Sequence, residues 1–490
     1  MVASRSSGGI AAWGTYLPYW RLQRAAIGGV LGSGGGKGTR AVASFDEDTT
    51  TLGVEAGRRA LAAGPGPGAV QDVWLSTPDP AYLDKTSATT LHAALGLGRS
   101  CGAYDFAGSS RSATGTLLQA LSAAATDNGR TTLAVLADLR TGLAGSPEER
   151  DSGDGAAAFV CASEGAVAAL VGRGAASDEF LDRWRVPGEA DSHVWEERFG
   201  EELYVTLARE AFAAALKDAG VAEGDVDHAI VTGLHVRAVK AAASGLGVGE
   251  GVLAPDLVAS VGNLGAAHAG VALCDVLERA RPGQVIVVLS LADGADAFVL
   301  RTTPALADAQ RARAAAGLAS VADQVATGRD DLSYASFLTW RGQLRREPPR
   351  RPDPERPGAP IVHRSEEWKY GFVGSRCQVC GFRHMPPTRA CLSCHAIDQM
   401  RPERLADVPG TVATFTVDHL AFSLSPPVVG VIVDFDGGGR YRCEITDVKA
   451  SELAIGDRVT MTFRRIWTAQ GVHNYFWKAR PAGPLGDRGA

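Results

Sequence analysis

The chain lacks both a long apolar run and an excess of charge of one sign. No stretch reaches the roughly 18 consecutive apolar residues that a membrane-spanning helix needs. Its 490 residues carry 49 Lys and Arg against 55 Asp and Glu, so the net charge of −6 gives the surface no general attraction for nucleic acid or anionic lipid. The first residues, MVASRSSGGIAAWG, lack the hydrophobic centre of a signal peptide. We therefore expect a soluble cytoplasmic protein with neither a membrane nor a nucleic acid as partner.

Cysteine is also scarce, since eight residues in this length are too few for a disulfide scaffold. Four of them form the pattern CxxC-x10-CxxC, in which two thiolate pairs can complete a tetrahedral Zn²⁺ site; they are Cys377, Cys380, Cys391 and Cys394. Four thiolates fill the coordination sphere, so the predicted zinc is structural. His384 and His395 lie nearby and rank below the four thiols as ligands.

From the start to about residue 335, apolar segments of strand length alternate with helical patterns. The segment DVWLST (72–77) is typical of a buried strand, and EELYVTLAREAFAAALKDAG (201–220) of an amphipathic helix. Two similar segments, DGAAAFV (154–160) and DGADAFV (293–299), each follow a Val/Leu-rich strand. The pattern predicts an α/β layered fold built from a duplicated unit over residues 1–335.

The character of the sequence changes at residues 336–365, where prolines and arginines predict a stiff, extended linker. The cysteine motif places a zinc ribbon at 366–400. Five strand candidates separated by turn signals follow over 401–484, and this number suits a small β-barrel of the OB-fold type.

The stretch DFAGSSRSATGTLLQAL (105–121) places two serines at the start of an amphipathic helix. A serine in this position is usually a helix cap, because its oxygen satisfies an unpaired backbone N–H. The alternative is a nucleophile at a helix N-terminus, where the helix dipole favours negative charge. The stretch alone leaves both readings open.

Several motifs, taken in order, resemble the thiolase-like superfamily. They are GIAAWGTYLPYWRL (9–22), DEDTTTLGVEAGRRAL (46–61), SGDGAAAFV (152–160) and GNLGAAHAGVAL (262–273). The similarity is strongest to archaeal-type hydroxymethylglutaryl-CoA synthases and their ketoacyl-synthase-III relatives. The tail is similar to the zinc-ribbon/OB domain (DUF35-like) of acyl-CoA-associated proteins, which is often a separate partner of thiolase-like enzymes.

The resemblance implies a set of site residues. The family's nucleophilic Cys falls at Ser110, its His at His235 and its Asn at Asn263, with Lys240 as a candidate for binding a CoA phosphate. It also implies a homodimer.

Two departures from the family matter. No Cys stands at 109–112, and Pro78 occupies the place of the general-base Glu, with Asp79 adjacent as a substitute. Without the thiol and the Glu, we do not expect the chain to make hydroxymethylglutaryl-CoA.

The leading hypothesis is an acyltransferase or condensing enzyme of polyketide or other specialised metabolism. It would load an acyl group from a CoA or carrier-protein thioester onto Ser110 and pass it to an acceptor. One alternative is a retro-aldol acyl-CoA lyase without an acyl-enzyme, in which Asp79, Tyr82 or His235 supplies the acid or base. The other is a non-catalytic paralogue that binds acyl-CoA.

Overall fold

A computed structural model describes residues 8–483, apart from residues 33, 127–128, 250, 351 and 353. The chain divides into two compact units. The first extends to Tyr334; the second begins at Ala335 and also takes in Ser44–Glu47 and Ala93–Gly96.

The first unit contains one nine-stranded sheet whose strand order repeats itself. In the first half the order is β5-β4-β6-β7-β1, and in the second half it is β11-β12-β13-β8. The strands of the first half are β1 (Gly9–Tyr16), β4 (Asp72–Thr77), β5 (Gly102–Ala107), β6 (Thr132–Asp138) and β7 (Gly155–Ala162). Those of the second half are β8 (Ala168–Ala176), β11 (His228–Gly233), β12 (Val285–Leu291) and β13 (Ala295–Thr302).

Parallel and antiparallel pairs also repeat between the halves. The pairs β4–β6 and β11–β12 are parallel, whereas β6–β7 and β12–β13 are antiparallel. In the first half β5 pairs with β4 at the edge of the sheet. At the equivalent edge of the second half, a parallel bridge joins Ala229 of β11 to Leu253. The predicted duplicated α/β fold is therefore confirmed.

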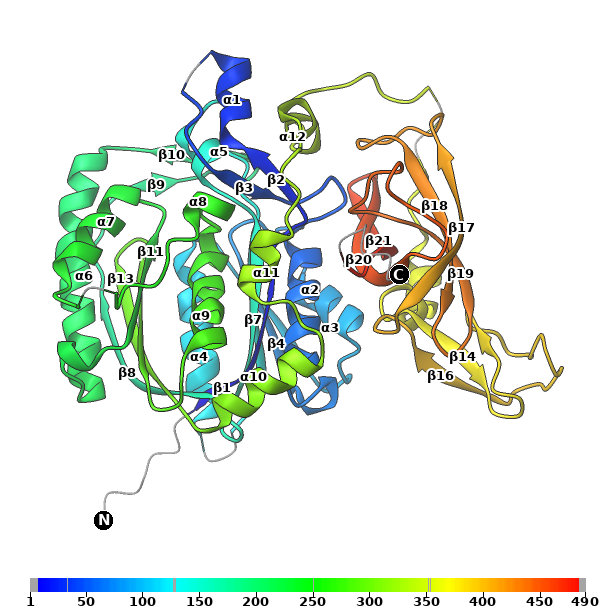
Figure 1. Cartoon of the computed structure of the whole chain (residues 1–490), viewed down its shortest axis with the longest axis horizontal. Helices are drawn as coiled ribbons and strands as arrows, with labels where there is room; N and C mark the ends of the chain where they lie inside the picture. Colours follow the sequence, from blue (N-terminus) through cyan, green and yellow to red (C-terminus); the bar gives the residue numbers. More distant parts are fainter. Residues whose placement is uncertain are drawn as a thin grey trace. The chain divides into compact units, whose positions relative to one another are not determined.

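Helices cover both faces of the sheet in layers (Figure 1). The helices α4 (Arg111–Ala124) and α9 (His268–Arg279) lie between the two halves, while α2 (Thr49–Ala62) covers the outer face of the first half. The outer face of the second half is covered by α6 (Glu197–Ala219) and α7 (Val236–Gly245). Further elements of the unit are β2 (Trp20–Gln23), α1 (Arg24–Leu31), β3 (Thr39–Val42), α3 (Ala88–Leu95), α5 (Pro147–Asp151), β9 (Arg183–Trp184), β10 (His193–Val194), α8 (Val258–Val261), α10 (Ala305–Ala315) and α11 (Val321–Ala326).

The outer helices approach the sheet closely because glycines face them. A Cβ at Gly14 of β1 would stand 2.4 Å from the Ala56 carbonyl oxygen of α2. A Cβ at Gly174 of β8 would stand 2.2 Å from the Ala211 carbonyl oxygen of α6. The two halves thus pack an outer helix in the same way, which requires glycine at equivalent places.

The second unit contains a three-stranded sheet and a five-stranded barrel. The first is formed by β14 (Val373–Cys377), β15 (Arg383–His384) and β16 (Met400–Arg404). It carries the four-cysteine cluster, whose sulfur atoms all lie within 4.8 Å of one another and could hold a metal ion, as a zinc ribbon requires.

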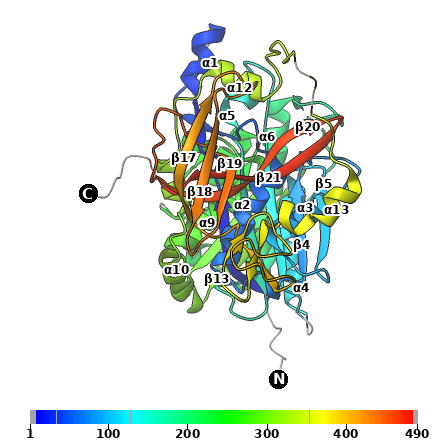
Figure 2. The same cartoon turned by 90° about the vertical axis from the view of Figure 1, so that its right-hand side faces the viewer.

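The barrel strands are antiparallel neighbours in the order β19-β18-β17-β20-β21. They are β17 (Gly410–Asp418), β18 (Val428–Phe435), β19 (Arg440–Glu444), β20 (Arg458–Ala469) and β21 (Val472–Pro481), and Figure 2 shows them from the side. A parallel bridge between Ile445 and Ala479 joins the end of β19 to β21. This arrangement confirms the predicted OB-fold.

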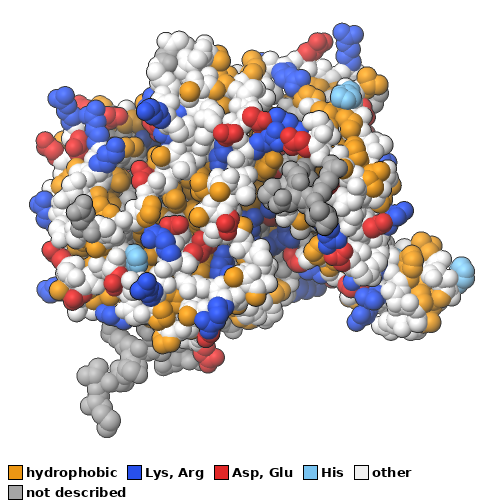
Figure 3. Space-filling view, in the orientation of Figure 1, with side chains coloured by type: hydrophobic (Ala, Val, Ile, Leu, Met, Phe, Trp, Pro, Cys, Tyr) orange, Lys and Arg blue, Asp and Glu red, His pale blue; other side chains and the backbone are white. Residues whose placement is uncertain are grey.

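The proline- and arginine-rich segment forms no helix or strand between α12 (Tyr334–Trp340) and α13 (Ala359–Arg364) among the residues that the structure describes. A short helix, α14 (Glu366–Lys369), follows it. Within the described residues, no helix combines the length and the apolar character that a membrane span needs. Acidic and basic side chains are interspersed over the face seen in Figure 3.

A buried histidine begins α9. His268 is 7% exposed, and its Nδ1 accepts a hydrogen bond from the Leu264 N–H at 3.2 Å, as only an unprotonated nitrogen can. Burial lowers the pKa of His268 to about 4, and Asp256 offsets this only in part.

This histidine predicts a loss of stability in mild acid. In the unfolded chain its pKa is about 6.5, so between about pH 6.5 and 4 only the unfolded state takes up the proton. The free energy of unfolding should fall by up to about 3 kcal/mol over this range. His268→Asn keeps an acceptor at the Nδ1 position, and thermal melting between pH 4.5 and 7.5 should show a weaker pH dependence for it. An equal dependence in both proteins would contradict the prediction, and His363→Asn, at an exposed position, is the control.

Candidate active site

A cavity of about 670 Å³ opens in the first unit where strands of both halves end. Residues directly after β4 and β5 line it from the first half, and residues after β11 and β12 line it from the second. Residues 182–190 and Ser192, which belong to β9, β10 and the turn between them, cover one side. We refer to residues 182–192 as the hairpin segment. The carboxyl ends of parallel strands are the usual place for a ligand site in an α/β fold.

Ser110 lines this cavity directly before α4. Gly108, with φ of 127°, turns the chain from β5 into the helix, a conformation that favours glycine. Ser110 has helical backbone angles and its hydroxyl makes no capping hydrogen bond. The neighbouring Ser109 instead accepts a bond from the Arg111 N–H at 3.3 Å. The cap reading therefore does not hold for Ser110.

His235 lines the same cavity at the start of α7. Its Nδ1 accepts a hydrogen bond from the Ala238 N–H at 3.1 Å, so the proton is on Nε2, which donates to the Glu197 carbonyl at 2.8 Å. Both ring nitrogens are thus engaged by the backbone, and the ring caps α7.

Asp79 and Tyr82, which the sequence analysis named as possible acid or base groups, also line the cavity. The Asp79 N–H donates to the Thr77 hydroxyl at 3.0 Å and its carbonyl accepts from the Thr49 hydroxyl at 2.7 Å, which fixes the turn after β4.

Asn263 and Lys240 are not among the residues that line the cavity in the described part of the chain. The Asn263 amide donates to the Gly233 carbonyl at 2.8 Å and accepts from the Gly265 N–H at 3.0 Å. Asn263 therefore holds the loop before α9 against the end of β11. Lys240 is exposed on α7.

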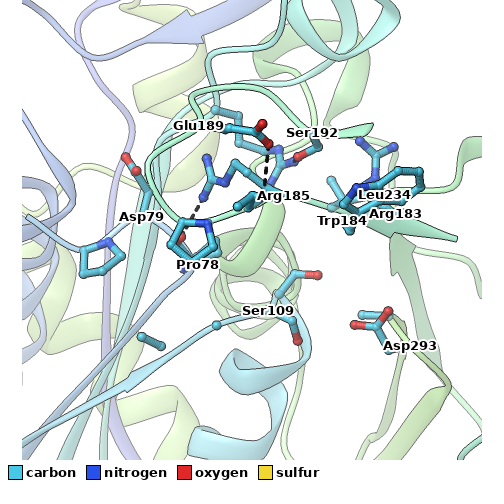
Figure 4. A pocket seen from close by; sticks show the side chains of 18 of the residues that line it. Pro78, Asp79, Ser109, Arg183, Trp184, Arg185, Glu189, Ser192, Leu234 and Asp293 are labelled. Carbon is cyan, nitrogen blue, oxygen red and sulfur yellow. Dashed lines mark hydrogen bonds between the residues drawn. The ribbon is translucent and has the colours of Figure 1, made fainter. Parts of the chain in front are cut away.

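Asp293 is a cavity residue that sequence reasoning missed. It opens the DGADAFV segment in the turn between β12 and β13, with φ of 47°, and its N–H donates to the Tyr204 hydroxyl at 3.2 Å. Burial raises the pKa of Asp293, as does the nearby Asp182, while Arg111 and a hydrogen bond with Ser109 lower it in part. The repeated motif marked this position, but only the fold places it near Ser109 (Figure 4).

Arg111 joins the start of α4 to the second half of the sheet. Its guanidinium donates to both carboxylate oxygens of Asp296, at 2.7 and 3.1 Å, and to the Asp293 carbonyl at 2.5 Å. A bidentate bond of this kind fixes direction as well as distance. It holds the serines of one half against the Asp293 turn of the other.

Three arginines line the cavity, and none of them was expected from the sequence: Arg140, Arg183 and Arg185. Arg140 is buried beside Asp138 and Glu148. Burial alone would lower the pKa of Arg140, but these two carboxylates more than offset it and raise that pKa. The Arg185 guanidinium donates to the Pro78 carbonyl at 2.6 Å (Figure 4). No periodic pattern marks the hairpin segment, which holds Arg183 and Arg185, or the loop after β6, which holds Arg140.

The chain is similar to characterised proteins along most of its length. It is 30% identical over 350 residues to the hydroxymethylglutaryl-CoA synthase of Aeropyrum pernix, an alignment that covers 69% of this chain and 95% of the relative. It is 28% identical over 347 residues to that of Methanocella arvoryzae, covering 69% of this chain and 98% of the relative. Residues 403–464 match a family model described as "ChsH2, C-terminal OB-fold domain".

Solved structures show the same fold. MvaS in complex with 3-hydroxy-3-methylglutaryl coenzyme A superposes with a TM-score of 0.59 at 20% identity, covering 71% of this chain and 94% of that one. The HMG synthase of the curacin biosynthetic pathway, in complex with acetyl donor-ACP, gives 0.59 at 19% identity, covering 68% and 88%. FabH, the 3-oxoacyl-(acyl carrier protein) synthase III of Pseudomonas aeruginosa PAO1, gives 0.54 at 21% identity, covering 61% and 98%.

The repeated sheet, the cavity at its strand ends and the identity along nearly the whole length of the relatives agree with one another. The chain belongs to the hydroxymethylglutaryl-CoA synthase family.

Proposed function

We propose that the protein is an acyltransferase of the condensing-enzyme type that takes an acyl group from a thioester onto Ser110. The observation that carries this proposal is the Ser110 hydroxyl, which lines the cavity at the N-terminus of α4 and is not used as a cap. Family membership supports acyl transfer, and the CoA and carrier-protein complexes among the structural neighbours support thioesters of either kind as donors.

In the proposed reaction, the Ser110 oxygen attacks the thioester carbonyl and an oxyester replaces the carbon–sulfur bond. The thiol leaves with the proton that the serine gives up. The partial positive charge of the α4 N-terminus favours the oxyanion that forms at the carbonyl oxygen. The acyl group then passes to an acceptor, which regenerates the serine.

A serine hydroxyl needs a base, because it is a much weaker nucleophile than a thiolate. We assign this role to Asp293, which lies in the cavity near enough to Ser109 for this serine to lower its pKa in part. A carboxyl group whose pKa is raised by burial is a better proton acceptor than an exposed one. His235, as it lies, would have to give up a backbone bond before it could take a proton.

A second candidate is the retro-aldol lyase, which needs an acid and a base but no acyl-enzyme. The carboxyl groups of Asp79 and Asp293 and the hydroxyl of Tyr82 share the cavity, and this observation favours it. Mass spectrometry of the intact protein after exposure to a panel of acyl-CoAs separates the two. An adduct mapped to residues 105–121 supports transfer, whereas turnover without an adduct supports the lyase.

Ser110→Ala should abolish acyl labelling and reduce turnover by several orders of magnitude, because the covalent step is lost. Ser109→Ala is the matched control and should cost much less. Ser110→Cys should still be acylated, and its thioester should pass the acyl group less well to an oxygen or nitrogen acceptor. Near-normal turnover of Ser110→Ala would assign the serine to the cavity wall and leave the lyase as the better reading.

A pair of variants tests whether His235 acts on the substrate or only caps α7. His235→Ala removes the cap and the imidazole together, and should cost about 1 kcal/mol of stability as well as activity. His235→Asn retains an acceptor for the Ala238 N–H but has no imidazole. If His235 takes part in catalysis, labelling rates should fall in both variants. Normal rates in His235→Asn, with normal melting, would restrict the residue to capping.

We also propose that the four-cysteine cluster binds one structural Zn²⁺. The donor set fits, since four thiolates within 4.8 Å of one another match a closed tetrahedral site. Such a site stabilises the ribbon around it and leaves no position open for a substrate.

Elemental analysis should therefore find one zinc per chain. Chelation, or Cys377→Ser with Cys394→Ser, should make residues 373–404 sensitive to protease while Ser110 can still be acylated. Cys443→Ser, which changes a cysteine outside the cluster in the same unit, should retain the metal. A metal-free protein, or an intact ribbon after loss of the four thiols, would contradict the proposal.

A further inference from the structure

The hairpin segment presents two arginines to the cavity. Arg183 lies in β9 and Arg185 directly follows this strand, and both residues line the cavity. The Trp184 ring stacks on His193 of β10, with ring centroids 5.3 Å apart, and this holds the hairpin together. The hairpin thus positions both guanidinium groups at the cavity.

Of the three arginines at the cavity, Arg185 is the one without a carboxylate in ion-pair distance. Arg140 pairs with Asp138 and Glu148, and Arg183 lies 3.6 Å from the same Glu148. Among the described residues no ion pair joins Arg185 to a carboxylate, although Asp182 and Glu189 of the hairpin segment also line the cavity. The charge of Arg185 is therefore available to a bound anion.

Two of these arginines also have a side-chain N–H without a hydrogen-bond acceptor among the described residues. The Nε atoms of Arg140 and Arg183 are buried and have no hydrogen-bond partner within the described parts of the chain. A buried guanidinium N–H without an acceptor is costly, so an oxygen from a bound molecule would be stabilising here.

The opposite side of the cavity has the opposite charge. Asp293 lies next to Ser109, across from Arg183, Arg185 and Ser192 (Figure 4). Asp182, on the hairpin segment itself, accepts a hydrogen bond from Tyr204 at 3.2 Å. An anionic group is therefore disfavoured beside Asp293 and favoured at Arg185.

We propose that the acyl group delivered to Ser110 carries a carboxylate at its far end, which Arg183 and Arg185 bind, with the positive charge of Arg140 nearby. This inference rests on the proposed acyl transfer and names its substrate class as a dicarboxylic monothioester. A phosphate of the CoA or carrier arm shares the same anionic oxygen chemistry, so the experiment has to separate the two sources.

The test uses four thioesters: succinyl and butyryl groups, each on N-acetylcysteamine, which has no phosphate, and each on CoA. Binding is measured by titration calorimetry to Ser110→Ala protein, in which the covalent step is blocked. The succinyl ester of N-acetylcysteamine should bind at least about tenfold more tightly than the butyryl ester, as a charge-assisted hydrogen bond in a partly buried site allows.

Arg185→Gln and Arg183→Gln should each remove most of that preference without weakening butyryl binding. Arg185 is the cleaner variant, because its only hydrogen bond in the structure is to the Pro78 carbonyl. Arg311→Gln, at an exposed position on α10, is the matched control and should change nothing.

Equal binding of the succinyl and butyryl esters would overturn the proposal, as would failure of the succinyl ester to bind. If both CoA esters bound more tightly than both N-acetylcysteamine esters, and the arginine variants lost this difference, the arginines would bind a phosphate instead. A succinyl preference in Ser110→Ala protein, together with no acylation of Ser110 in the unchanged protein, would retain the carboxylate site and reject acyl transfer.

Discussion

The pairing of β1 with β8 is the contact on which the site depends. Among the described residues two pairs, Gly9 with Ala169 and Ile10 with Ala168, join these strands and connect two similar half-sheets into one. Once the halves are joined this way, the ends of β4 and β5 face those of β11 and β12. Neither half alone could form the cavity, because each contributes part of its lining.

Because both halves form the cavity, Arg111, which connects them, is as important for the site as the groups that would react. The serines belong to the first half and Asp293 to the second, and a small shift between halves would separate them. The bidentate bond from Arg111 to Asp296 crosses the junction at this point. It therefore holds the start of α4 against the Asp293 turn, so the proton transfer that we propose would take place across a fixed contact.

Periodicity and motif order predicted the scaffold well. The strand expected at 72–77 is β4, and the helix expected from residue 201 begins earlier, at Glu197, because a hydrophobic pattern defines a face better than an end. The serine and histidine positions were also predictable, since each stands where a strand passes into a helix.

The arginines and Asp293 were not predictable, for a physical reason. They lie in the hairpin segment, in the loop after β6 and in the turn after β12, where side-chain direction depends on tertiary contacts that no local period records. The Asn263 amide is bonded to Gly233 and Gly265, and the motif that marked this residue did not predict these contacts.

The two copies of the DGAxAFV segment place their aspartates in different surroundings. In the first copy, Asp154 is fully buried, and its carboxylate accepts hydrogen bonds from the Ala43 and Arg140 N–H groups at 2.7 and 2.9 Å. In the second copy, the equivalent Asp293 faces a cavity from a left-handed backbone conformation. The same aspartate of the repeated motif therefore joins two segments of backbone in one half and lines the cavity in the other.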